Sequence, residues 1–198
     1  MGVQNSHLIE IFGRGDPLSL DARKRFRLPD ALVDELRVAF HRVATHTDLS
    51  PDAINRLPFY FAPGTQNRIF LVPAPNLHVL TDRLEHPAAG SDPVQVRKAR
   101  DYFYSLLRYA DADRQNRLQI PDALQRHAGI EDGAESVSLI CRGLWFVLCR
   151  AETEQQMLAD GKAAFDQHGD DLLDPIEPGM PNEGPSDQSG PQSHSRDV

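Results

Sequence analysis

Residues 21–32 read DARKRFRLPDAL, and residues 113–124 read DRQNRLQIPDAL. Aligned without a gap, the two segments are identical at six of twelve positions. Two further positions are apolar in both copies, where Phe26 matches Leu118 and Leu28 matches Ile120. Such agreement within one chain predicts an internal repeat, and a repeat is interpreted first as a repeated structural unit.

Similar predicted elements follow each copy. After the first copy we expect a helix over 31–43, a hairpin of strands 59–61 and 69–72, and a helix over 76–84. After the second copy we expect a helix over 122–128, strands over 136–141 and 144–149, and a helix over 152–165. A helix over 93–109 connects the copies. The sequence therefore predicts an α+β protein with strand–turn–strand, helix, hairpin and helix, twice over.

The charge is unevenly distributed along the chain. The chain carries 29 acidic and 21 basic side chains, for a net charge of −8. The stretch from Asp170 to Val198 holds seven acidic residues, one basic residue and five prolines, and it has no aromatic residue. Such a composition cannot bury enough apolar surface to fold, so we predict a disordered acidic tail over 169–198. The remaining domain boundaries are a first repeat over 8–86, a connecting helix over 87–110 and a second repeat over 111–168.

The composition also limits where the protein acts. Hydrophobic residues make up 40% of the 198 positions, enough for a globular core. The longest apolar run, Leu144–Cys149, is far shorter than the roughly 20 residues that cross a membrane. The first ten residues do not have the pattern of a signal peptide. Cys141 and Cys149 do not make a disulfide framework and are expected to be core thiols. A cytoplasmic protein without a membrane partner is the expectation.

Each copy of the repeat places an aspartate four residues before an arginine, as Asp21 and Arg25, and as Asp113 and Arg117. In a tight loop the carboxylate can accept a backbone N–H and also orient the arginine. An arginine held in this way suits contact with a phosphate or a guanine edge. The first loop is unusually basic, because Arg23, Lys24, Arg25 and Arg27 fall within seven residues.

The blocks LDARKRFRLP (20–29) and DADRQNRLQIP (111–121) resemble the two DxxxR motifs of the MraZ family. These proteins are bacterial transcription regulators of the cell-division and cell-wall gene cluster. The resemblance implies tandem swapped-hairpin β-barrel repeats of the SpoVT/AbrB type with flanking helices. It also implies a nucleoid-associated, ring-like homo-oligomer that binds short direct repeats in double-stranded promoter DNA. The DNA-binding residues it implies are Arg23, Lys24, Arg25, Arg27, Arg114, Gln115, Asn116 and Arg117, with Asp21 and Asp113 orienting the loops.

The chain departs from this family at one position of each motif. The family usually has glycine just before the motif arginine, where this chain has Lys24 and Asn116. Asparagine tolerates a left-handed backbone, whereas lysine adopts it at a steric cost. The first loop is therefore the one expected to differ in shape.

Other patterns in the sequence bear on metal binding and catalysis. Residues 111–122 resemble an EF-hand loop, but Asn116 replaces its turn glycine, Asp122 its final glutamate, and Pro121 intrudes. The eight histidines follow no ligand spacing and are expected at the surface, and no HExxH, CxxC, GxSxG or P-loop pattern occurs. We therefore predict no enzyme, no catalytic residue, no metal and no cofactor. The alternative to a DNA-binding regulator is an oligomeric scaffold or protein-interaction module on the same fold.

Overall fold

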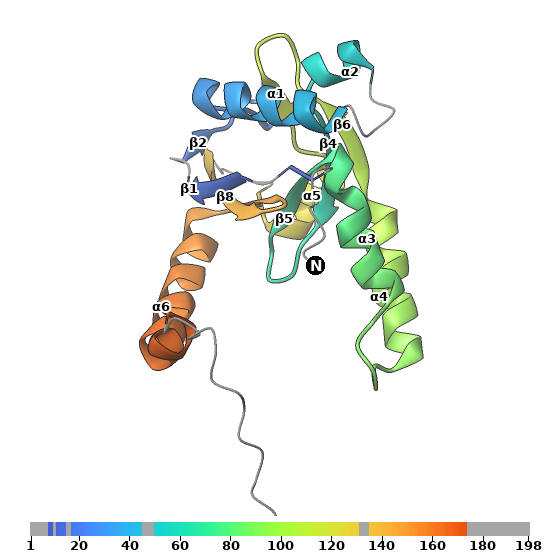
Figure 1. The fold of residues 1–198 in the computed structure, drawn as a ribbon, viewed down its shortest axis with the longest axis vertical. Helices are drawn as coiled ribbons and strands as arrows, with labels where there is room; N and C mark the ends of the chain where they lie inside the picture. The colour runs from blue at the N-terminus through green and yellow to red at the C-terminus, as the bar shows by residue number, and fades with distance from the viewer. Residues whose placement is uncertain (1–7, 10, 15–16, 45–49, 131–134, 174–198) are drawn as a thin grey trace, which may run out of the picture. The chain divides into compact units, whose positions relative to one another are not determined.

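The computed structural model describes residues 8–9, 11–14, 17–44, 50–130 and 135–173 (Figure 1). The chain divides into two compact units, residues 1–160 and residues 161–198. The first unit holds every strand described below. Within the described ranges, no helix combines the length and apolar character needed to span a membrane.

The two halves share an order of strand, strand, helix, two strands and helix, to which the first half adds further elements. The first half contains β1 (Ile11–Arg14), β2 (Leu18–Ser19), β3 (Arg25–Arg27), α1 (Asp30–Ala44), α2 (Pro51–Asn55), β4 (Pro58–Pro63), β5 (Ile69–Pro73), η1 (Ala74–Asn76) and α3 (Leu77–Glu85). After α4 (Pro93–Leu106), the second half contains β6 (Arg108–Asp111), β7 (Arg117–Gln119), α5 (Asp122–Ala128), β8 (Ser136–Gly143), β9 (Phe146–Cys149) and α6 (Ala151–Leu173). The predicted α+β class and the duplicated order are confirmed, while β1 and α2 were not predicted.

Local chemistry explains several of the boundaries. The Val33 N–H donates to Pro29 O at 2.9 Å to close the first turn of α1, whose buried side chains follow a helical period. Gly129 ends α5 with φ 65°, and Gly143 takes φ 71° at the end of β8. A left-handed backbone suits glycine at both places.

Two predicted helix ends are wrong. The connecting helix was predicted over 93–109, but α4 ends at Leu106, where Leu107 turns extended and the chain continues as β6. The closing helix was predicted over 152–165, yet α6 continues to Leu173. No proline precedes position 175 after residue 151, so nothing in that stretch prevents continued helix. The rest of the predicted tail lies outside the described residues.

Strands from both halves form one antiparallel sheet. Its order is β1-β8-β9-β5-β4-β6, and β2 also pairs with β8. Counted from β6 to β2, the path β6-β4-β5-β9-β8-β2 places every strand opposite its counterpart in the other half. The hairpins join through β5 and β9, where Phe70 is registered against Val147. The strand pairing therefore has a two-fold symmetry that relates one repeat to the other.

A second sheet of two strands, here called the motif ribbon, consists of β3 and β7. Its register sets Phe26 against Leu118 at the centre. Both side chains are buried, and the Phe26 ring packs edge-on against Phe61 with centroids 6.5 Å apart. The central core therefore draws on both halves and anchors the inner face of the ribbon.

A buried asparagine fastens the N-terminal segment to the second half. The Asn76 side chain is fully buried. Its Oδ1 accepts a hydrogen bond from the Ile9 N–H at 2.9 Å, and its Nδ2 donates to Ile9 O and Leu144 O, both at 2.7 Å. One side chain thus satisfies three backbone groups from distant parts of the chain.

Candidate nucleic-acid interface

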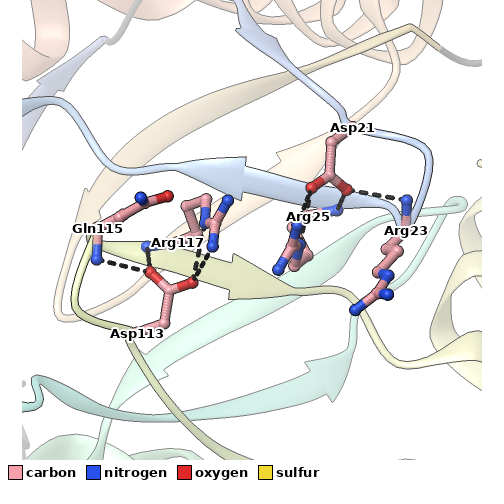
Figure 2. Close-up of polar contacts among 6 residues, drawn as sticks. All are labelled: Asp21, Arg23, Arg25, Asp113, Gln115 and Arg117. Atoms are coloured by element: carbon pink, nitrogen blue, oxygen red, sulfur yellow. Dashed lines mark hydrogen bonds and ion pairs between the residues drawn. The ribbon is translucent and has the colours of Figure 1, made fainter.

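The first motif loop is held by its aspartate (Figure 2). Asp21 Oδ1 accepts the backbone N–H groups of Arg23 and Arg25, both at 2.9 Å. Asp21 Oδ2 accepts Nε and Nη2 of Arg25 at 2.7 and 2.6 Å. The carboxylate therefore caps the turn and fixes the guanidinium by one edge, which confirms the predicted geometry of the pair.

The second motif loop repeats this arrangement contact by contact (Figure 2). Asp113 Oδ1 accepts the N–H groups of Gln115 and Arg117 at 2.8 and 3.0 Å. Asp113 Oδ2 accepts Nε and Nη2 of Arg117, both at 2.8 Å. The two arginines also have similar exposure, with 25% of the Arg25 side chain and 31% of the Arg117 side chain accessible.

The expectation that the first loop differs in shape is wrong. Lys24 has φ 55° and Asn116 has φ 58°, so both adopt the left-handed conformation that glycine favours. Lys24 N–H donates to Asp21 O at 2.8 Å, and Asn116 N–H donates to Asp113 O at the same distance. The backbone and carboxylate hydrogen bonds of the turn hold the lysine in this conformation despite its Cβ.

Each loop is tied to the strand that follows the other loop. The Leu28 N–H donates to Asn116 O at 2.9 Å, and the Ile120 N–H donates to Lys24 O at 3.1 Å. The loops consequently flank the two ends of the motif ribbon. Three residues at about 3.3 Å each separate them, which is about 10 Å of strand.

The register divides the motif ribbon into two faces. Arg25 is paired with Gln119, and Arg27 with Arg117, while Phe26 and Leu118 between them face the core. Because side chains alternate along a strand, these four polar residues share the outer face. This outer face, together with the two loops, is the candidate site.

Charge on this surface differs from that of the whole chain. Residues 21–30 and 113–122 hold six basic and four acidic side chains, against a net charge of −8 for the chain. Asp21 and Asp113 are bound to the motif arginines, and Asp30 accepts Nη2 of Arg27 at 2.7 and 3.1 Å. Three of the four carboxylates lie against arginines, and with six cations to four anions the surface carries more positive than negative charge.

Hydrogen bonding keeps both loop carboxylates ionised. The side-chain hydrogen bond from Arg25, followed by that from its backbone N–H, lowers the pKa of Asp21 to about 2. Partial burial acts to raise the pKa of Asp113, but the hydrogen bonds from Arg117 and Gln115 outweigh it and leave the pKa lowered. Each aspartate therefore stays charged and keeps its arginine oriented throughout the neutral range.

Every predicted site residue falls on this surface. Arg23, Arg27, Arg114 and Gln115 are exposed, and Lys24, Arg25, Asn116 and Arg117 are partly buried in or beside the turns. Sequence reasoning missed Gln119, the ribbon partner of Arg25. Its signal was available, because Gln119 occupies the place of Arg27 in the second copy of the repeat.

The segment that resembles an EF-hand has a different local structure. Strand β6 ends at Asp111 and β7 begins at Arg117, so the helix–loop–helix of a calcium site is not formed. Asp111 accepts the Tyr109 hydroxyl at 2.5 Å, and Asp113 is bound to Arg117. Burial, then this hydrogen bond to Asp111, raises the pKa of Tyr109 to about 12. Across the described ranges, no group of three or more His, Cys, Asp or Glu side chains is placed to hold a metal.

Two other expectations concern cysteine and histidine. Cys149 is buried and Cys141 partly buried, both are free thiols, and burial raises both pKa values to about 11, as expected of core thiols. The expectation that histidines lie at the surface is wrong for His127, which is partly buried. Its Nε2 donates to Gly64 O at 2.7 Å, and its Nδ1 bonds the Tyr102 hydroxyl at 2.7 Å.

Compared with protein-family models and with curated proteins, the chain gives no match to either.

Proposed function

We propose that the chain is a sequence-specific DNA-binding transcriptional regulator resembling MraZ. It binds short direct repeats in a promoter as a ring-like homo-oligomer. In this proposal the halves are tandem repeats of the SpoVT/AbrB swapped-hairpin barrel type. The observation that carries it is the pair of equivalent Asp–Arg loops at the two ends of one ribbon.

The dimensions of the motif ribbon suit duplex DNA. The major groove of B-DNA is about 12 Å wide and admits a two-stranded β-ribbon. The motif ribbon has two strands about 4.8 Å apart and is about 10 Å long between its loops, so it is small enough to enter that groove. The outer face carries Arg25, Arg27, Arg117 and Gln119, which are side chains able to bind phosphates or base edges.

Orientation of the arginines supports the same function. In each loop the aspartate takes the Nε–Nη2 edge of the guanidinium, and the group has five N–H donors in all. The remaining donors form a second edge that is available to a bidentate acceptor such as a guanine or a phosphate. Because the side chain is already fixed, less rotamer entropy is lost on binding. One ribbon offers few contacts, so affinity comes from several subunits on repeated sites.

Replacing the motif arginines tests the proposal. Arg25→Ala and Arg117→Ala should each weaken binding to the DNA upstream of the chain's own gene by about 5- to 150-fold, the effect of losing a bidentate contact. Gel-shift titration measures affinity, and light scattering checks that assembly is intact. Arg97→Ala, an exposed arginine on α4, is the charge-matched control and should bind as the parent does.

Unchanged affinity in both variants would contradict the assignment of the site. If the parent chain assembles but binds no DNA duplex in the gel shift, the second candidate is favoured, an oligomeric scaffold or protein-interaction module. The net charge of −8 is the observation that favours that candidate. A chain that binds its upstream DNA only through the motif arginines excludes it.

A further inference from the structure

The two motif loops share their backbone but not their side chains. An offset of 92 residues relates each position of the first loop to its counterpart in the second, as Asp21 to Asp113 shows. The aspartate and the motif arginine are the same in both copies. Apart from the buried pair Phe26 and Leu118, the positions that differ in side chain around them are Ala22 and Arg114, Arg23 and Gln115, Lys24 and Asn116, and Arg27 and Gln119.

The first loop presents cations. Arg23 and Arg27 are exposed, and 61% of the Arg27 side chain is accessible. Lys24 lies between them at the left-handed position of the turn. Lysine and arginine neutralise phosphate charge and release counterions, which strengthens binding to DNA of any sequence.

The second loop presents amides at three of the same four positions. Gln115 and Gln119 are exposed, and Asn116 occupies the left-handed position that Lys24 holds in the first loop. A carboxamide carries a donor beside an acceptor, the pattern that pairs with N6 and N7 of adenine in the major groove. These side chains add no charge, so they contribute to the choice of base more than to the electrostatic part of binding.

A symmetric site would call for the same side chains at equivalent positions. Such equality holds where the fold itself demands it, at the aspartates and the motif arginines. It fails at the positions whose side chains are not required by the turn. The backbone relation is two-fold, while the chemistry that faces outward is not.

Resting on the proposed DNA-binding function, we propose that one chain binds a non-palindromic DNA site with divided roles. The loop of residues 21–27 binds phosphates and supplies affinity. The loop of residues 113–119 reads base edges, adenine foremost, and supplies discrimination.

A matched pair of glycine variants tests this division. Lys24→Gly and Asn116→Gly each delete one side chain at a position whose φ suits glycine, so neither strains its loop. The probes are the duplex that the full chain selects from a randomised library and a mixed random-sequence duplex. Affinity for both is measured between about 50 and 200 mM salt. Each protein then yields a salt slope and a specificity ratio.

The division predicts opposite outcomes for the two variants. Lys24→Gly should reduce the salt slope by about 0.9 and leave the specificity ratio unchanged. Asn116→Gly should leave the slope unchanged and lower the ratio by about 5- to 150-fold. Arg23→Ala and Gln115→Ala repeat the comparison at an exposed pair of equivalent positions.

Failure of this inference is distinguishable from failure of the proposed function. If the parent chain discriminates between the two probes but both glycine variants alter the same quantity equally, the divided roles are refuted and DNA binding stands. If the parent chain shows no discrimination, the proposed function is refuted together with the division.

Discussion

Leu118→Ala should destabilise the fold at the point where the two halves meet. Leu118 is fully buried at the centre of the motif ribbon, in register with Phe26. No other backbone pair of the ribbon places both of its side chains in the core. Removing the leucine side chain beyond Cβ therefore opens a cavity beneath the centre of the motif ribbon.

The magnitude follows from the atoms removed. The substitution deletes three buried carbons, and each is worth about 0.8 kcal/mol in transfer from water, for a loss of about 2.4 kcal/mol. The cavity adds to this loss, because neighbours relax only partly, which places the total at about 3 to 5 kcal/mol. A domain of ordinary stability has a free energy of unfolding of about 5 to 15 kcal/mol, so a change of this size is large enough to measure accurately.

Urea unfolding of the full chain, followed by circular dichroism, measures this loss. Leu158→Ala is the matched control, because half of the Leu158 side chain is exposed on α6. That control should change the free energy of unfolding by no more than about 0.5 kcal/mol. A loss below about 1 kcal/mol for Leu118→Ala, with the slope against urea unchanged, would refute the placement of this side chain in a shared core.

Two further predictions concern a buried amide and a loop carboxylate. Asn76→Ala leaves the Ile9 N–H and the carbonyls of Ile9 and Leu144 without their side-chain partner, and should lower the free energy of unfolding in urea by about 2 to 4 kcal/mol. The control Asn55→Ala, at an exposed position, should lower it by under about 0.5 kcal/mol. Equal losses in the two variants would contradict the buried network. The pKa of Asp21 is about 2 in the folded chain and ordinarily 3.8, so its stabilisation is complete above pH 3.8 and is lost as pH falls toward 2. A nuclear magnetic resonance titration of this carboxyl with a midpoint at 3.8 or above would contradict the ion pair.

Local signals in the sequence were sufficient for most elements. The helices predicted over 31–43 and 122–128 match α1 and α5. The Asp–Arg spacing of both motifs likewise predicted the turn and the side chain that orients the arginine. These features depend on contacts within about five residues, which a sequence displays directly.

Features that depend on distant partners were not predicted. The pairing of β3 with β7 joins residues that are far apart in the sequence, such as Phe26 and Leu118, which are 92 positions apart. No local pattern specifies such a pairing. Strand β1 exists because it pairs with β8, and helix α4 gives way to β6 because β4 offers an edge to residues 108–111. The conformation of Lys24 was missed for a related reason, since intrinsic preference argued against it and the hydrogen bonds of the turn overrode that preference.

Strands of the two halves pair with each other, so each half depends on the other for part of its structure. A strand of three residues has no stability alone, and among the described strands β3 pairs with β7. The Leu28 N–H and the Ile120 N–H each bond the carbonyl of the left-handed residue in the opposite loop. Local hydrogen bonds shape each loop, and one bond from the other half then ties it to the opposite end of the ribbon. Pairing of β3 with β7 is consequently what brings the two arginines onto one ribbon, as the proposed DNA-binding surface requires.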